Sequence, residues 1–305
     1  MWLNREQNLV SDEKEPAAPE KTERKGRPPR ETALTRIQQR AEKVIEEKVN
    51  QLPLWADDLR SAPNEMLRSA LFTVGNRNQA REFINGRELH CYGNARIYYT
   101  GQELRQEDDM DVWLQVVHMA RTEKLGNRVS FRPSEMKKEL RWPRGKDYTQ
   151  KLLNVLERLK ATSVRIESTR LGKGVGVSLL RRFEYTTEEG DLSDTWHVEI
   201  EPEMAILFAA DVYTTRLDWQ SRLELRPLAK WLHGFYGTHR EPYGIKVETI
   251  RESCGSKAKT EAKFKQMLRD ALDELKNIDF LKEWDIGKDN IVRVVRNNRP
   301  LLKSE

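Results

Sequence analysis

Gln150 and Asn154, one helical turn apart in the segment KDYTQKLLNVLERLK, have side chains that can read DNA bases. Glutamine and asparagine amides bind adenine N6 and N7 together, whereas lysine and arginine bind guanine or phosphate. At about 100° per residue, both amides project to the side opposite the segment's apolar residues. Lys146 lies near them, and Lys151 and Arg158 lie on the flanks. The spacing predicts a helix with one buried face and one face that reads base edges.

A second segment, TEAKFKQMLRDALDELKN, has the same arrangement. Lys263, Gln266 and Asp270 face away from its apolar residues, and Lys259 precedes its N-terminal end. A helix N-terminus also presents unpaired N–H groups that bind phosphate. We therefore expect this helix to contact DNA as well.

The two segments align at an offset of 116 residues. The matched pairs are Tyr148 with Phe264, Leu152 with Leu268, Leu156 with Leu272, Leu159 with Leu275 and Lys160 with Lys276. Any two amphipathic helices resemble each other to some degree. The flanking elements also follow the same predicted order, a helix, a strand, a short helix, the long helix and two strands, and this shared order indicates an internal repeat.

Two helices joined by a short turn and followed by a β-hairpin are typical of a winged helix. The predicted fold class is therefore α+β, with tandem winged-helix domains at residues 63–212 and 213–305. In the first domain, the hairpin turn LGKG would place Lys173 at a phosphate as part of the wing. Residues 1–50 are rich in charge, proline and alanine, which predicts a disordered charged arm. Residues 51–62 would link this arm to the folded domains.

Basic residues gather on the two predicted helix-turn-helix segments. Residues 141–182 contain eleven basic against three acidic residues, although the whole chain carries a net charge of only +5. Residues 251–269 contain six basic against two acidic residues. Exposed helices are often charged, but the coincidence with both segments favours contact with double-stranded DNA. Arg141, Arg144 and Lys257 join the predicted DNA-binding residues on this ground.

The same sequence offers little for catalysis. Cys91 and Cys254 lack metal-ligand spacing, and the five histidines are scattered. LGKGVGVS does not end as a phosphate-binding P-loop does. We predict no metal site, no cofactor and no catalytic residue, and we expect a protein that is not an enzyme. No apolar run reaches the ~18 residues of a membrane span, and no signal peptide is evident, so we expect a cytoplasmic protein without membrane contact.

Five segments carry a resemblance to a known family, and they occur in the order MLRSALFTVGNRN, IYYTGQELRQEDDMDVWLQV, VSLLRRFEY, ILFAADVYT and FYGTHREPYGIKVETIRESCGS. Together they resemble the TrfA family of plasmid replication initiators. The resemblance runs from about Gln51 to Val295. It implies a bacterial protein with two winged-helix domains that binds repeated origin sites, called iterons, and opens the adjacent DNA. It also implies recruitment of the host replication initiator and the replicative helicase, and homodimers linked to copy-number control.

Members of this family also carry a short peptide, QLSLF, that is similar to the consensus for binding the bacterial sliding clamp. It matches Gln51, Leu52, Leu54 and Trp55 here, with Pro53 in place of serine. The position of QLPLW between a charged arm and the first folded element favours an exposed clamp-binding tag over part of the core. On this hypothesis Leu54 and Trp55 are its anchors.

Two other classes of protein deserve comparison. A winged-helix transcriptional repressor would share every DNA-binding feature, but it has no evident need for a clamp-binding peptide. A nicking replication enzyme needs a catalytic tyrosine beside a histidine cluster that holds a metal, and Tyr98 and Tyr99 have no such neighbours in the sequence. The repressor is therefore the alternative that stays open.

Overall fold

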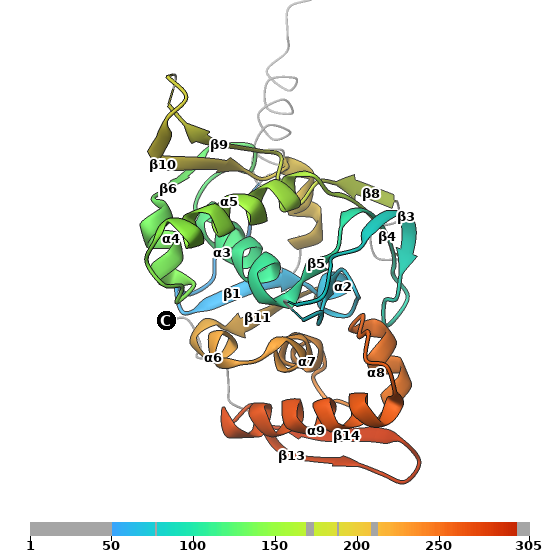
Figure 1. Cartoon of the computed structure of the whole chain (residues 1–305). Helices are drawn as coiled ribbons and strands as arrows, with labels where there is room; N and C mark the ends of the chain where they lie inside the picture. Colours follow the sequence, from blue (N-terminus) through green and yellow to red (C-terminus); the bar gives the residue numbers. More distant parts are fainter. Residues whose placement is uncertain (1–50, 77, 169–173, 188, 209–212, 298–305) are drawn as a thin grey trace, which may run out of the picture. The chain divides into compact units, whose positions relative to one another are not determined.

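A computed structural model describes residues 51–297, apart from residues 77, 169–173, 188 and 209–212 (Figure 1). The predicted disordered arm at residues 1–50 lies outside this part of the chain, and so does Lys173. The described residues belong to one compact unit, Lys43–Glu305.

The first hydrophobic core surrounds α3 (Asp111–Ala120), in which nine of ten side chains are buried. A helix that is apolar on most sides needs cover on most sides, and sheets and helices supply it here. A four-stranded antiparallel sheet has the order β3 (Phe83–Leu89), β4 (Arg96–Gln102), β7 (Ser163–Glu167), β8 (Gly174–Val177). A three-stranded sheet has the order β6 (Val129–Phe131), β10 (Leu192–Glu199), β9 (Arg182–Thr186). The remaining elements are β2 (Phe72–Thr73) parallel to β5 (Leu104–Arg105), α2 (Asn64–Leu67), α4 (Pro133–Glu139), α5 (Lys146–Lys160), a π-helical turn (Gln106–Met110) and a 3-10 helix (Pro202–Phe208).

The second core lies between α7 (Pro227–Gly237), α9 (Glu261–Asn277) and a three-stranded sheet. The strand order in that sheet is β12 (Ile245–Lys246), β14 (Ile291–Arg296), β13 (Leu281–Ile286), and α8 (Val247–Ser253) follows β12 directly. Figure 1 shows α9 lying along the β13–β14 hairpin. The apolar positions matched at the offset of 116 are buried in both long helices, except for Tyr148, which is half-buried.

The two cores separate at a different place from the predicted boundary at residue 213. Strand β1 (Leu59–Pro63) pairs with β11 (Thr214–Asp218), so the predicted linker and the predicted second domain meet in one ladder. Leu217 and Trp219 belong to the first core, whereas Leu225 belongs to the second. The first core therefore extends to α6 (Trp219–Glu224).

The predicted hairpin after α5 consists of β7 and β8, which pair antiparallel. The segment VGVSLLRRFEYT continues past β8 and forms a second strand, β9, because residues 178–181 interrupt the ladder. Strand β8 joins β7 in the four-stranded sheet. The two three-stranded sheets have the same topology. In each, the strand that precedes the short helix, β6 or β12, pairs with the last strand of the later hairpin, β10 or β14. By topology, the counterpart of the β13–β14 hairpin is therefore β9–β10.

QLPLW is part of the folded structure, so its interpretation as a tag outside the core is wrong. Leu52 and Trp55 are 3% and 7% exposed and belong to the first core, whereas Leu54 is 65% exposed. The Trp55 indole N–H donates to His118 Nδ1 at 3.0 Å, and its ring stacks on Phe208. Exposed Gln51 forms a β-bridge with Lys124. Trp55 in QLPLW is buried by residues far away in the sequence, such as His118 and Phe208, and local spacing does not reveal these contacts.

Candidate nucleic-acid interface

Helix α5 presents a polar face that matches the prediction. Gln150 and Asn154 are exposed, and Gln150 Nε2 donates to Asn154 Oδ1 at 2.9 Å. Arg144 and Lys146 are exposed at the start of this helix and form no ion pair within the described part of the chain. Two amides and two free cations along one face have the groups needed for base edges and phosphates.

Helix α9 has the second polar face. Thr260 caps it, because its hydroxyl oxygen accepts from the backbone N–H of Lys263 at 3.2 Å. Lys263 Nζ donates to Gln266 Oε1 at 3.3 Å, and both side chains are exposed, as are Lys259 and Asp270. Lys259 precedes the helix, and Lys263 and Gln266 lie in its N-terminal half, where unpaired backbone N–H groups favour phosphate.

Arg158 and Lys151, predicted on the flanks of α5, have partners inside the protein. Arg158 donates through Nε and Nη2 to Asp109 Oδ1 at 3.0 and 2.8 Å, and Asp109 is fully buried. Lys151 Nζ lies 2.6 Å from Asp108 Oδ1 and 4.2 Å from the centre of the Trp142 ring. Both cations therefore brace α5, and neither is available to DNA in this conformation.

The sequence does not reveal this role, because acids just before an apolar helical segment are typical of the helix's first turn. The chain has non-helical φ and ψ at Glu107 and Asp108, and α3 begins only at Asp111. This bend turns Asp109 inward, toward Arg81 and Arg158. One feature of the sequence could have indicated buried acids here. It is the run EDDMD, in which four of five residues are acidic, just before a strongly apolar helix.

Arg141 and Lys257 are also held by partners. Arg141 donates to Gln220 and to Glu224, the latter at 3.3 Å. Lys257 Nζ lies 3.0 Å from Glu103, which is 1% exposed. Burial raises the pKa of Glu103, but hydrogen bonds from Thr73 and Lys257 outweigh it, so the net pKa is lowered and the carboxylate stays charged. The charge that placed both residues among the DNA contacts is thus used within the fold.

The two hairpins differ in charge at their tips. The β13–β14 tip carries exposed Lys288, with Asp289 paired to Arg293 at 2.7 Å. The β9–β10 tip carries exposed Glu189 and Asp191. Like charges repel, so the acidic tip is a poor ligand for a DNA phosphate. Lys173, the predicted wing residue, lies outside the described residues.

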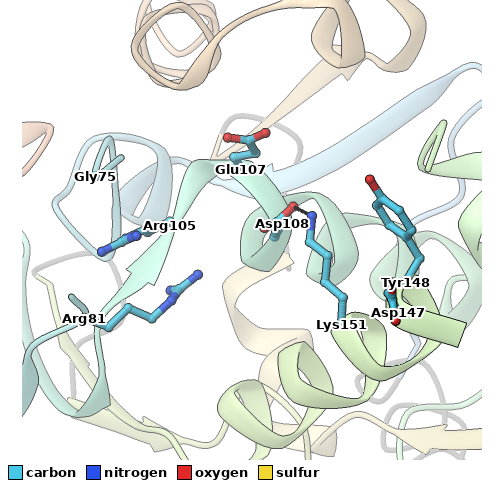
Figure 2. A pocket seen from close by; sticks show the side chains of 8 residues that line it. All are labelled: Gly75, Arg81, Arg105, Glu107, Asp108, Asp147, Tyr148 and Lys151. Atoms are coloured by element: carbon cyan, nitrogen blue, oxygen red, sulfur yellow. Dashed lines mark ion pairs between the residues drawn. The ribbon is translucent and has the colours of Figure 1, made fainter. Parts of the chain in front are cut away.

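A cleft of about 450 Å³ lies beside the N-terminal end of α5 (Figure 2). Its lining contains three cations, three acids and two other residues, namely Arg81, Arg105, Lys151, Glu107, Asp108, Asp147, Gly75 and Tyr148. Figure 2 shows the ion pair between Lys151 and Asp108 across this cleft. Because cations and acids balance, the cleft has no net attraction for phosphate.

Among the described residues, no three histidine, cysteine, aspartate or glutamate side chains are placed to hold a metal ion. No helix in that part of the chain is long and apolar enough to cross a membrane.

Two solved structures share the fold. Domains 2 and 3 of RctB superpose with a TM-score of 0.52 over 77% of this chain and 98% of that one, at 10% identity. The Pi initiator protein, solved in complex with iteron DNA, gives 0.52 over 81% and 100%, also at 10% identity. The mixed α/β fold is therefore similar to that of RctB domains 2 and 3 and of the Pi initiator protein.

The sequence comparisons define the family. The model of the TrfA protein family matches residues 14–296. The plasmid replication initiator protein TrfA of Escherichia coli is 34% identical over 236 residues, which are 77% of this chain and 61% of that protein. The chain belongs to the TrfA family, and it spans about three fifths of the length of this relative.

Proposed function

We propose that this chain is a plasmid replication initiator that binds iterons at an origin through α5 and α9. The observation that carries the proposal is the pair of exposed polar faces on two helices of the same order and packing. Each face has side-chain amides beside exposed cations, with Gln150 and Asn154 on α5 and Lys263 and Gln266 on α9. Membership in the TrfA family and the fold of the iteron-bound Pi initiator support it.

Each reading helix belongs, on this proposal, to a winged helix. The second unit is α7, α8, α9 and the β12–β14–β13 sheet, with β13–β14 as its wing. The first unit is α3, α4, α5 and the β6–β10–β9 sheet. Its β9–β10 tip is acidic, so we expect only the second wing to contact phosphate. The chain acts by binding, and origin opening then draws on binding energy and DNA deformation.

Base reading by α5 is tested with the double substitution Gln150→Ala and Asn154→Ala. Each bidentate contact contributes about 1–3 kcal/mol of base discrimination, so the variant should lose at least about tenfold in affinity for its selected site. Its affinity for random DNA should stay nearly constant, because phosphate contacts remain. The control is Glu157→Gln, at an exposed position of the same helix. An equal loss on both DNAs would exclude base reading by α5.

The initiator also recruits host proteins on this proposal, namely the host replication initiator, the replicative helicase and the sliding clamp. Homodimers restrain copy number. The clamp would bind at Gln51, Leu52, Leu54 and Trp55. Since Leu52 and Trp55 are buried, the clamp can take this peptide only after Trp55 leaves His118 and Phe208.

Clamp recruitment is tested by pull-down of purified sliding clamp with Leu54→Ala. Leu54 is 65% exposed, so this change removes a predicted anchor with little effect on the fold. We expect clamp binding to fall while binding to iteron DNA is retained. Unchanged recovery of the clamp would remove this part of the proposal.

A further inference from the structure

Lys137, on α4, is a buried lysine at the turn that leads into α5. The residue is only 8% exposed, and among the residues that the structure describes no carboxylate forms an ion pair with it. A buried ammonium group is costly unless its hydrogen bonds are made. Lys137 Nζ makes them with the Gly145 carbonyl oxygen at 3.1 Å and Thr149 Oγ1 at 2.7 Å.

The Gly145 carbonyl is the point at which α5 begins. Gly145 is the N-cap of α5, with φ 135° and ψ 164°, a conformation that favours glycine. Its oxygen also accepts from the N–H and the hydroxyl of Thr149, at 3.3 and 3.2 Å. Lys137 is therefore bonded to both ends of the first turn of α5.

The second unit holds its turn in a comparable way with a different residue. Arg251, on α8, donates through Nη2 to the carbonyl oxygen of Ala258 at 2.5 Å. Ala258 lies two residues before Thr260, the N-cap of α9. In both units, a cation on the shorter helix thus bonds to a backbone carbonyl at the entry to the reading helix.

We propose that Lys137 and Arg251 are positioning residues that set the direction of α5 and α9 for base reading. The inference rests on the proposed function and extends it to two side chains that do not themselves face the DNA. A reading helix that tilts by a small angle keeps its charges near the phosphates but moves its amides out of register with base edges. Loss of either cation should therefore lower discrimination between sequences more than general affinity.

The test uses the full chain and a duplex that the wild-type protein selects from a random pool. Fluorescence anisotropy gives the Kd for this duplex and for a scrambled duplex of equal length, at several salt concentrations. For Lys137→Met, which keeps the apolar stem, we expect about a tenfold loss on the selected duplex. The Kd on the scrambled duplex should change less than about twofold, and the salt slope should be unchanged, because the set of phosphate contacts is the same. Lys137→Arg restores the donor and should recover most of the loss.

Two further variants separate this role from simple stabilisation. Thr149→Val removes one of the two acceptors of Lys137 and should give a smaller loss in the same direction. Arg251→Met should repeat the pattern of Lys137→Met. Equal losses on both duplexes, or no loss on either, would overturn the inference while leaving the proposed function intact. Failure of the wild-type protein to select any duplex would overturn both.

Discussion

Trp55 and Leu54 are adjacent, yet the structure gives them opposite roles. Replacing Trp55, a residue only 7% exposed, with alanine removes an indole that packs against Phe208 and against His118 near the end of α3. Removal of a buried tryptophan costs about 3–5 kcal/mol of unfolding free energy. Trp55→Phe keeps a ring but leaves His118 Nδ1 without its 3.0 Å donor, which costs about 1–3 kcal/mol.

Leu54→Ala is the matched control, because an exposed side chain contributes within about 0.5 kcal/mol. Urea unfolding followed by tryptophan fluorescence and far-UV circular dichroism measures all three variants. We expect the order of stability to be Leu54→Ala, then Trp55→Phe, then Trp55→Ala. If Trp55→Ala is as stable as Leu54→Ala, Trp55 is not part of the core and its assignment as an exposed tag is restored.

Three other changes test the packing around the candidate interface. Asp109→Asn removes the buried negative charge that pairs with Arg81 and Arg158, and it should lower the free energy of unfolding in urea by about 3 kcal/mol. Asp270→Asn, at an exposed position of α9, should leave the free energy of unfolding nearly unchanged. If the two variants are equally stable, Asp109 does not brace α5. Burial, with nearby arginines, lowers the pKa of His118 and of His233 to about 3. As the pH falls below 6.5, both histidines are therefore protonated first in the unfolded chain, so the free energy of unfolding at pH 5.5 should be about 2–3 kcal/mol lower than at pH 7.5. His118→Gln should reduce this drop, and a free energy of unfolding that does not change between these pH values would contradict the burial of both rings. Gly255→Ala places a Cβ 2.8 Å from Thr73 Cγ2 at a φ of +63°, and it should lower the melting temperature, whereas Gly176→Ala, in open space, should not.

The sequence predicted those features that depend on local spacing. Amphipathic period and capping residues are written into about fifteen consecutive positions, so the buried faces of α5 and α9 and the exposure of Gln150, Asn154 and Gln266 were foreseeable. The order of helices and strands around each long helix was foreseeable for the same reason.

The features that the sequence did not predict depend on contacts between distant segments. Trp55 is buried by His118 and Phe208, sixty or more residues away, and no period in QLPLW signals this. Strand β6 pairs with β10, and not with β8, across a stretch in which several strands could have served. The residue type also does not show whether a lysine or arginine contacts DNA or pairs with a buried acid. Charge counting therefore could not separate Lys146 from Arg158.

Footprinting of the purified chain on the origin of its plasmid tests the proposed function most directly. We expect several protected sites of equal length and related sequence, with major-groove protection that is lost in the Gln150→Ala, Asn154→Ala variant. Uniform or absent protection over the origin would contradict iteron binding through α5 and α9.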